Sequence, residues 1–516
     1  MTFARLADAS ATEFKDIRPP FSNFQFVDSL LPDNDYSAVR RLFSLARKDG
    51  LGNALILEDI EPLGAVEDEI AEISALFPGY QCTGLKRLTF WSRLCTSLEE
   101  MGQLTDGDLL GYAILKRDSV PLRPPRWHVF ESVFRKYGHK HNCIPGEPFF
   151  TLRCGTREYR LNGVMYCQQN GLNKACAQVA LRSLLSRILC NQDVNYSEMN
   201  TVARKSDPAL VPGTGLATGQ IRAILEHHGV RYDDFDYIAT PTDPLPYARL
   251  VYAGVENGLG ALLGFELSGA GAHEEKHIIP FYGHTFNQDT WVPRASLAYF
   301  HVGDNTQYIS SVEWMSSFVG HDDNFGGNYC VPRKFLEPDQ VKYVVALRPA
   351  DTEYGAIEAE AFAVNCLYAT VNTLPQDNYW IRRLIRHITV QDVVLRTLYV
   401  TRNQYVEHLE AGRDWFGHAE KPEILSRFAT DLPEHLWMVE ISIPELFPAN
   451  YRKLGEILLD ARVPLEPSTP HESLWVVARF PGSYLINDNP VPGSASFGTL
   501  DSNMDSHTPL YGTLEP

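Results

Sequence analysis

The fold is decided by one stretch of the chain, Gln168-Gln-Asn-Gly-Leu-Asn-Lys-Ala-Cys176-Ala-Gln-Val-Ala-Leu-Arg-Ser-Leu-Leu-Ser-Arg-Ile188. From Val179 onward its apolar residues recur at helical spacing, which predicts a helix with one buried face. We expect Asn173 to cap this helix, because its side-chain oxygen can accept hydrogen bonds from the free amides of the first turn. Cys176 is then the third helical residue, where unpaired N–H groups and the helix dipole favour a thiolate. The sequence therefore predicts a polarised thiol at the tip of a packed helix.

A cysteine at such a position needs a base before it can act as a nucleophile, since free cysteines often only fill a core. Downstream, Ala261–Leu267 and Lys276–Tyr282 predict two strands joined by a Gly-rich link, and His277 opens the second strand. We predict that His277 is the base. Other histidines compete with it, but isolated histidines are usually surface or satisfied core residues: His273, His284 and His321.

This order of elements resembles the papain-like cysteine peptidases, and among them the compact bacterial branch typified by the bacteriocin-leader-processing peptidases. The shared features are a glutamine shortly before a cysteine that opens a long helix, then further helices, a strand, and a strand that begins with histidine. The resemblance covers about residues 146–350. It implies an α+β central domain in which the Cys-bearing helix packs on an antiparallel sheet, with Cys176 as nucleophile and His277 as base.

The resemblance also implies a glutamine side chain that stabilises the oxyanion, usually about six residues before the cysteine. Asn170 occupies that position in this sequence, and Gln169 and Gln168 lie just before it. We choose Gln169 as the oxyanion donor, while Asn170 is chemically able to substitute for it.

A further acid or amide is expected to orient the histidine. Asp289 and Asn287 follow the histidine strand closely, but in a hairpin Asp289 would lie ~16 Å from His277, because each strand residue advances the chain by about 3.3 Å. A short apolar run further on ends in Asp322 and Asp323. We prefer Asp322, with Asp323 next. The alternative for this pair is an Asx-rich turn that only holds its own backbone.

Four segments are expected along the 516 residues. They are an N-terminal α/β accessory domain (1–145), the papain-like domain (146–350), a C-terminal α/β domain (351–484) and an irregular tail rich in Pro, Gly, Ser, Asn and Asp (485–516). Within the second segment, Phe149–Arg153 and Tyr159–Tyr166 predict a hairpin. In the third, Tyr379–His387 and Tyr451–Leu459 predict helices.

Composition narrows the class of protein. The net charge of −18 makes a nucleic-acid partner a poor expectation, because phosphate-binding surfaces are usually basic. No apolar run approaches the roughly 20 residues that span a bilayer, and the first residues lack the pattern of a signal peptide. The nine cysteines are an odd number without CxxC spacing, which favours reduced thiols. We expect a soluble, cytoplasmic protein without a metal or other cofactor.

The sequence thus predicts a cysteine-dependent hydrolase, meaning a peptidase, isopeptidase or deamidase, that forms a thioester with a peptide or protein substrate. Two alternatives stay open: a catalytically inactive papain-like scaffold that serves as a binding or regulatory module, and an amine-utilising acyltransferase similar to transglutaminases. An enzyme needs a low apparent thiol pKa and a wet cleft at Cys176, whereas a binding module permits a buried, neutral thiol.

Overall fold

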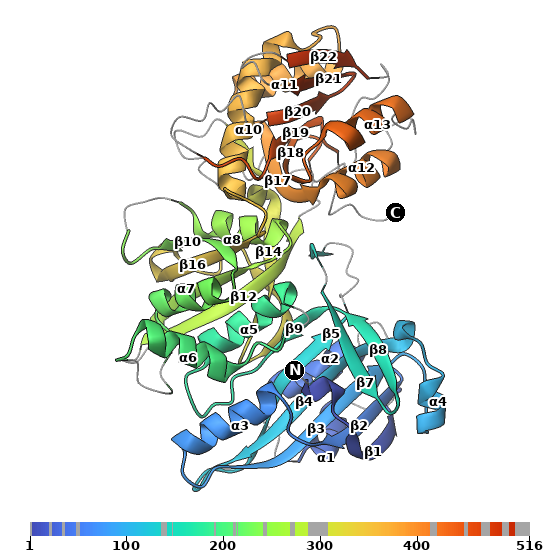
Figure 1. Ribbon diagram of the computed structural model, residues 1–516, viewed down its shortest axis with the longest axis vertical. Helices are drawn as coiled ribbons and strands as arrows, with labels where there is room; N and C mark the ends of the chain where they lie inside the picture. Colours follow the sequence, from blue (N-terminus) through green and yellow to red (C-terminus); the bar gives the residue numbers. More distant parts are fainter. Residues whose placement is uncertain are drawn as a thin grey trace.

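Three large β-sheets follow one another along the molecule, each with its own covering helices (Figure 1), and a separate two-stranded sheet is formed by residues 149–162. The computed structural model describes residues 3–19, 23–32, 37–47, 52–135, 142–146, 148–189, 192–209, 213, 215–240, 245–268, 274–286, 308–412, 421–447, 452–465, 475–487 and 495–500. The protein is a mixed α+β structure whose sheets are antiparallel apart from one pair of strands, β13 and β17. The flanking parts, expected to be α/β, are therefore α+β as well. Among the described helices, none combines the length and the apolar composition that crossing a bilayer requires.

The first sheet has the order β1 (Ala9–Asp16), β2 (Ala54–Ile60), β3 (Gln81–Trp91), β4 (Leu109–Ser119), β5 (Arg126–Phe134), β9 (Val164–Tyr166). Because successive strand residues point to opposite faces, the sheet buries both. Phe90 and Leu115 pack with α1 (Asn23–Leu30) and α2 (Ser37–Arg47). Ile56 and Ile114 face the other way, toward α3 (Ala65–Leu76) and the expected hairpin, which forms as β7 (Phe149–Cys154) and β8 (Arg157–Asn162). Through β9, this sheet extends past the boundary expected at residue 145.

The middle sheet has the order β10 (Arg231–Asp236), β16 (Val341–Arg348), β11 (Ala261–Ser268), β12 (Glu274–Phe286), β14 (Met315–Asp322), β15 (Gly326–Pro332), and β6 (Asn142–Cys143) also pairs with β12. One face, which includes Leu262 and Ile278, is covered by α5 (Cys176–Ile188), α6 (Tyr196–Ser206) and α7 (Thr218–His227). The opposite face, with Leu263 and Ile279, packs against α8 (Tyr247–Glu256). The Cys-bearing helix therefore lies directly against the strand that carries His277.

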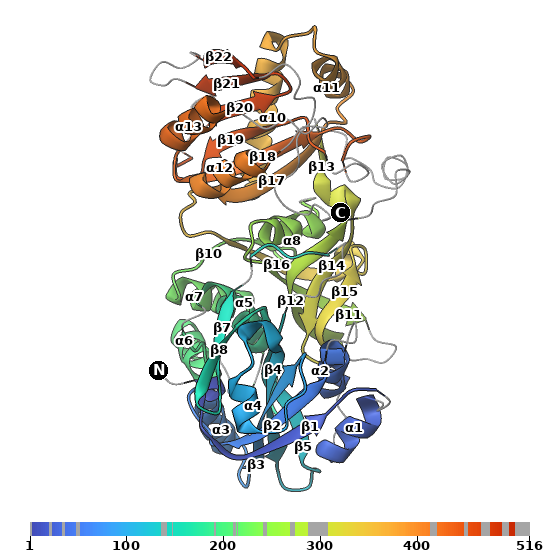
Figure 2. The ribbon, with the colours of Figure 1, turned by 90° about the vertical axis from the view of Figure 1, so that its right-hand side faces the viewer.

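The third sheet forms the C-terminal part and is seen from a second side in Figure 2. Its order is β13 (Ile309–Ser310), β17 (Val394–Thr401), β18 (His435–Ser442), β19 (Gly455–Asp460), β20 (Trp475–Phe480), β21 (Ser483–Asn487), β22 (Ala495–Thr499). The helices α10 (Ala356–Thr370) and α11 (Tyr379–Thr389) cover one face, and α12 (Arg402–Ala411) and α13 (Pro422–Asp431) the other. Because β21 and β22 are strands, the sheet continues into the segment that we expected to be irregular from residue 485.

One predicted helix is wrong. Where the helix Tyr451–Leu459 was predicted, the strand β19 begins at Gly455 and runs through Leu459. Ile457 packs with the helices on one face of the sheet and Leu458 with those on the other. A strand buried on both faces has no polar–apolar alternation, so its apolar residues matched a helical spacing by coincidence.

Candidate active site

The helix α5 begins at Cys176 itself, with Ala175 as its N-cap residue and no side-chain cap. The prediction that Asn173 caps the helix and places Cys176 third is therefore wrong. The physical reason lies in Asn170, whose Oδ1 accepts hydrogen bonds from the amides of Leu172 (2.8 Å) and Asn173 (3.2 Å). This turn delays the start of the helix. Cys176 is half-buried and still lies in the first turn, where the amides are free and the dipole favours a thiolate.

His277 is brought to Cys176 by strand β12. The Cys176 side chain lies close enough to the His277 imidazole to raise the pKa of the ring. Phe265, the cross-strand partner of His277 on β11, meets the imidazole edge-on with 5.6 Å between ring centroids. This contact restricts the rotation of the imidazole, so the ring is held beside the sulfur.

Two carboxylates hold the same imidazole from the neighbouring strand. β14 pairs with β12 and ends at Asp322. His277 Nε2 lies 3.3 Å from Asp322 Oδ2 and 3.4 Å from Asp323 Oδ1. The Oδ1 atom of Asp322 accepts hydrogen bonds from the backbone amides of Asn324 (2.8 Å) and Phe325 (3.1 Å). One oxygen of the Asp322 carboxylate therefore forms the turn, and the other faces the histidine.

The charges of the site depend on these contacts. Burial alone would lower the pKa of His277, but hydrogen bonds with Asp322 and Cys176 and the charges of both carboxylates raise this pKa to about 10. Burial likewise opposes ionisation of Asp322, yet His277 and the turn amides lower its pKa below the usual value. For Asp323 burial prevails, and the pKa is raised to about 6 in spite of His277. At neutral pH the imidazole is therefore protonated, and a positive charge lies beside the sulfur of Cys176.

The three polar residues before the cysteine have different surroundings. Gln168 is buried, and its Oε1 accepts a hydrogen bond from the amide of Val129 at 2.9 Å. Asn170 is buried as well and donates from Nδ2 to Glu69 at 3.0 Å. Gln169 is half-buried, and its Nε2 donates to Asn324 Oδ1 at 2.9 Å. Of the three, only Gln169 contacts the turn that carries the two aspartates.

Asn324 was missed by the sequence analysis. Its Nδ2 donates to Asp323 Oδ1 at 3.2 Å, so it connects Gln169 to the carboxylates that hold His277. A signal was present in Asp322-Asp-Asn-Phe-Gly-Gly327, because an asparagine after two aspartates and before two glycines is typical of a turn built from side-chain hydrogen bonds.

The first sheet supports this turn through α2. Arg41 donates from its guanidinium to the carbonyl oxygens of Gly327 (3.2 Å) and Asn328 (2.8 Å), and the Ser37 hydroxyl donates to that of Asn324 (3.0 Å). Gly326, at φ +118°, lets the chain pass close to Arg41, since a Cβ there would lie 2.9 Å from the arginine side chain. No local pattern in the sequence indicates this contact.

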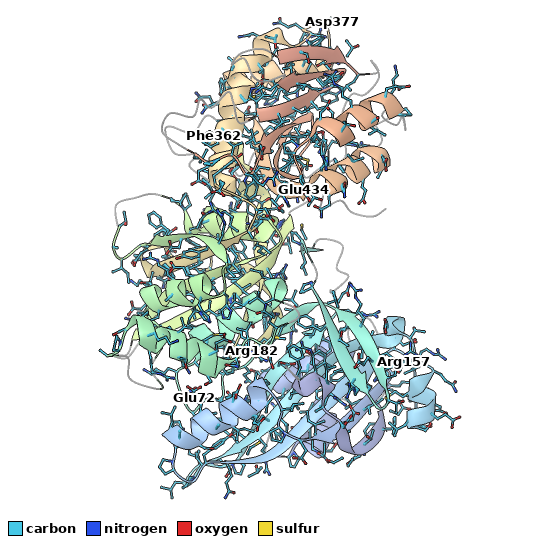
Figure 3. All side chains as sticks on the ribbon, in the orientation of Figure 1. Glu72, Arg157, Arg182, Phe362, Asp377 and Glu434 are labelled. Atoms are coloured by element: carbon cyan, nitrogen blue, oxygen red, sulfur yellow. The ribbon has the colours of Figure 1, made fainter. Side chains whose placement is uncertain are left out.

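The helix α5 is also tied to the first sheet, through the buried side chain of Arg182 (labelled in Figure 3). Its guanidinium donates to Glu131 Oε2 at 2.6 Å on β5, and to Asp193 Oδ1 at 3.3 Å and the carbonyl of Val194 at 2.9 Å just after α5. A buried arginine that keeps all these partners holds the helix in one position, because losing any of them would leave a buried charge or polar group unpaired.

The other candidate residues lie elsewhere or outside the described ranges. His284 is buried on β12 and forms an ion pair with Glu256. His321 is buried too, and its Nδ1 accepts from the amide of Asn328 at 3.2 Å. His273, Asn287 and Asp289 fall outside the residues that the structure describes.

Two groups in the described residues have the ligand types and spacing that a metal ion needs: Cys143 with Glu256 and His284, and His277 with Asp322 and Asp323.

The site residues expected from the sequence, Cys176, His277, Asp322 and Gln169, are brought into one connected cluster at the seam between the first and middle sheets. No protein-family model matches the chain, and no curated protein does.

Proposed function

We propose that this protein is a papain-like cysteine hydrolase, a peptidase, isopeptidase or deamidase that acts on a peptide or protein. One observation carries the proposal: a half-buried thiol at a helix N-terminus lies close enough to an imidazole to raise its pKa, and the Nε2 of that imidazole is held by a carboxylate at 3.3 Å. Nucleophile, base and orienting group are the three roles that covalent acyl transfer requires.

The proposed reaction begins at the sulfur. Because Nε2 of His277 faces the carboxylates, Nδ1 is left to exchange a proton with Cys176. The thiolate attacks the acyl carbon, and the resulting oxyanion accepts hydrogen bonds from the Cys176 amide and from Gln169. An amide group has two N–H donors, so Gln169 can keep its bond to Asn324 and donate the second. His277 protonates the leaving amine, and then takes a proton from the water that hydrolyses the thioester.

The architecture supports the papain-like assignment in the middle part of the chain. The helix that begins with the cysteine packs across an antiparallel sheet, and the acid lies at the end of the strand beside the histidine strand. The eight cysteines of the described residues are all free thiols, which agrees with the reducing compartment that we propose.

The proposal is tested by alkylation with iodoacetamide followed by peptide mapping in a mass spectrometer. Cys330 is an exposed thiol, so a Cys330→Ser protein removes the main background and serves as the reference. In it we expect Cys176 to be alkylated fastest, also below pH 7, and Cys176→Ala to abolish that labelling. His277→Ala should slow it, because the thiolate loses its counter-ion.

Two results would contradict the proposal that this protein is an enzyme. In the first, Cys176 reacts no faster than the exposed thiol of Cys330 in the unmodified protein. In the second, the alkylation rate of Cys176 does not change in His277→Ala. Either result would favour the binding-module alternative. A peptide library incubated with wild type and Cys176→Ala then shows whether cleavage depends on the thiol, and an added primary amine would accelerate turnover only for an acyltransferase.

A further inference from the structure

The carboxylate side of His277 has the geometry of a metal site. His277 Nε2 lies 3.3 Å from Asp322 Oδ2 and 3.4 Å from Asp323 Oδ1, and one ligand atom from each of the three residues lies within 4.8 Å of the others. A tetrahedral Zn²⁺ with bonds of about 2.0–2.1 Å to nitrogen and oxygen separates its ligand atoms by about 3.3–3.4 Å. An octahedral ion with bonds of the same length would require only about 2.9 Å. The two distances from His277 Nε2, which are also those of an ion pair, are compatible with the tetrahedral ion.

The charge of the cluster also favours a cation. Asp323 is 5 % exposed, and its Oδ2 atom is buried without a hydrogen-bond partner among the described residues. Neither Asp322 nor Asp323 forms an ion pair with a lysine or arginine in the described part of the chain, where His277 is their shared partner. Two carboxylates that share a single imidazolium leave a net negative charge and a free acceptor in a buried place, and such an arrangement is costly unless a cation joins it.

The second group of potential ligands shows the contrast. Cys143, Glu256 and His284 are all buried, but Arg396 from the third sheet forms an ion pair with Glu256 at 2.9 Å and lies 4.0 Å from the Cys143 sulfur. The guanidinium already supplies the positive charge there. That cluster is therefore an ionic link between the middle and third sheets, and it does not need a metal.

We propose that Zn²⁺ binds His277 Nε2, Asp322 and Asp323, and that this ion switches off the thiol site reversibly. The inhibitory role rests on the proposed function, whereas metal binding does not. Cys176 is not a ligand, since its sulfur is not part of the group of ligand atoms that lie close together. An ion bound to Nε2 also takes the Asp322 carboxylate as a ligand, so Asp322 no longer orients the imidazole toward Cys176 through its own hydrogen bond.

Metal binding is tested first in Cys176→Ala protein, where the result is independent of any catalytic activity. We titrate it with Co²⁺, whose visible absorption is strong in tetrahedral sites, and with Zn²⁺ in a calorimeter. One equivalent should bind with a tetrahedral spectrum. Adding Asp323→Asn should weaken binding at least about tenfold, because even partners outside the ligand shell change metal affinity by about 10–100-fold.

Asp377→Asn is the matched control. Asp377 is an exposed carboxylate at the far end of the C-terminal part (labelled in Figure 3), and its removal should leave the affinity unchanged. Absence of binding, or equal binding by the Asp323→Asn and Asp377→Asn proteins, overturns the site. Thermal unfolding of each variant shows that the fold is kept.

Inhibition is tested separately in the Cys330→Ser protein. Saturating Zn²⁺ should slow alkylation of Cys176, and a chelator should restore the rate. If Zn²⁺ binds with the expected ligand dependence but the alkylation rate of Cys176 stays the same, the inhibitory role is wrong. If Cys176 is unreactive even without metal, the proposed function fails while the metal titration of the Cys176→Ala protein still stands on its own.

Discussion

The substitution Asp322→Asn tests the electrostatic argument at its centre. The asparagine keeps the size of the side chain, and its Oδ1 can still accept the amides of Asn324 and Phe325, so the turn is preserved. What disappears is the negative charge 3.3 Å from His277 Nε2. The experiment thus separates the charge of Asp322 from its role in the backbone.

The expected magnitude follows from the pKa of His277. The site raises this pKa from 6.5 to about 10, which corresponds to a preference of about 5 kcal/mol for the charged ring. Asp322 supplies the largest favourable part, followed by Cys176 and Asp323. An opposite charge within hydrogen-bonding range typically shifts a pKa by about 1–3 units, so Asp322→Asn should lower the pKa of His277 by that amount. The ring then titrates between about pH 7 and 9.

Two measurements check this expectation. An NMR titration of the ring protons of His277 reports its pKa directly. The pH dependence of Cys176 alkylation in the Cys330→Ser background reports the pH up to which the ion pair between the two side chains persists. Asp377→Asn, with an exposed carboxylate, is the control and should change neither. The reasoning is refuted if His277 of the wild type titrates near its usual value, or if Asp322→Asn leaves a raised pKa unchanged.

Three further predictions concern the neighbours of this pair. Asp323→Asn should stabilise the protein by about 3 kcal/mol above pH 6 and by nothing below pH 4. Burial raises the pKa of this acid from 3.8 to about 6, and the resulting cost appears only when the group is ionised. Urea unfolding at both pH values measures the difference in stability. Arg41→Ala removes two hydrogen bonds to the start of β15, directly after the turn that carries the two aspartates, and should slow Cys176 alkylation and destabilise the protein by about 1–3 kcal/mol. Arg18→Ala, which removes an exposed pair with Asp16, should cost at most about 1 kcal/mol; equal effects would contradict the role of Arg41. Gln169→Ala should lower kcat by about 10²–10³-fold and leave the alkylation rate unchanged, whereas a parallel loss of both would indicate a structural role.

The sequence predicted the parts of the site that depend on local chemistry. Cys176 stood at a helix entrance, His277 near the start of a strand, and Asp322 at the end of a run of strand residues, so each could be found from its own segment. The prediction that His277 opens its strand is wrong by three residues, because β12 begins at Glu274. The start of α5 could not be placed, because it depends on which amides the Asn170 side chain accepts. The strand β19 was mistaken for a helix, since burial on both faces removes the alternation that identifies strands.

Long-range contacts account for the rest of what was missed. Arg41 and Gly327 are 286 positions apart in the chain, and no periodicity or motif connects residues at that separation. The same holds for Arg182 and Glu131, which join α5 to β5 across 51 positions. Such pairs are specified by how the sheets dock, and that docking is a property of whole surfaces.

These contacts change the role of the first sheet. It was expected to be an accessory domain, yet Gln169 lies just after its last strand, Arg182 anchors the cysteine helix to it, and Arg41 holds the turn that carries Asp322. The proposed oxyanion donor, nucleophile and acid are thus all positioned by the same neighbour. Because a displacement of about 1 Å at a catalytic group can cost about 100-fold in rate, the middle sheet with its helices alone would hold the reacting groups too loosely. The unit that carries the site is therefore the first and middle sheets together.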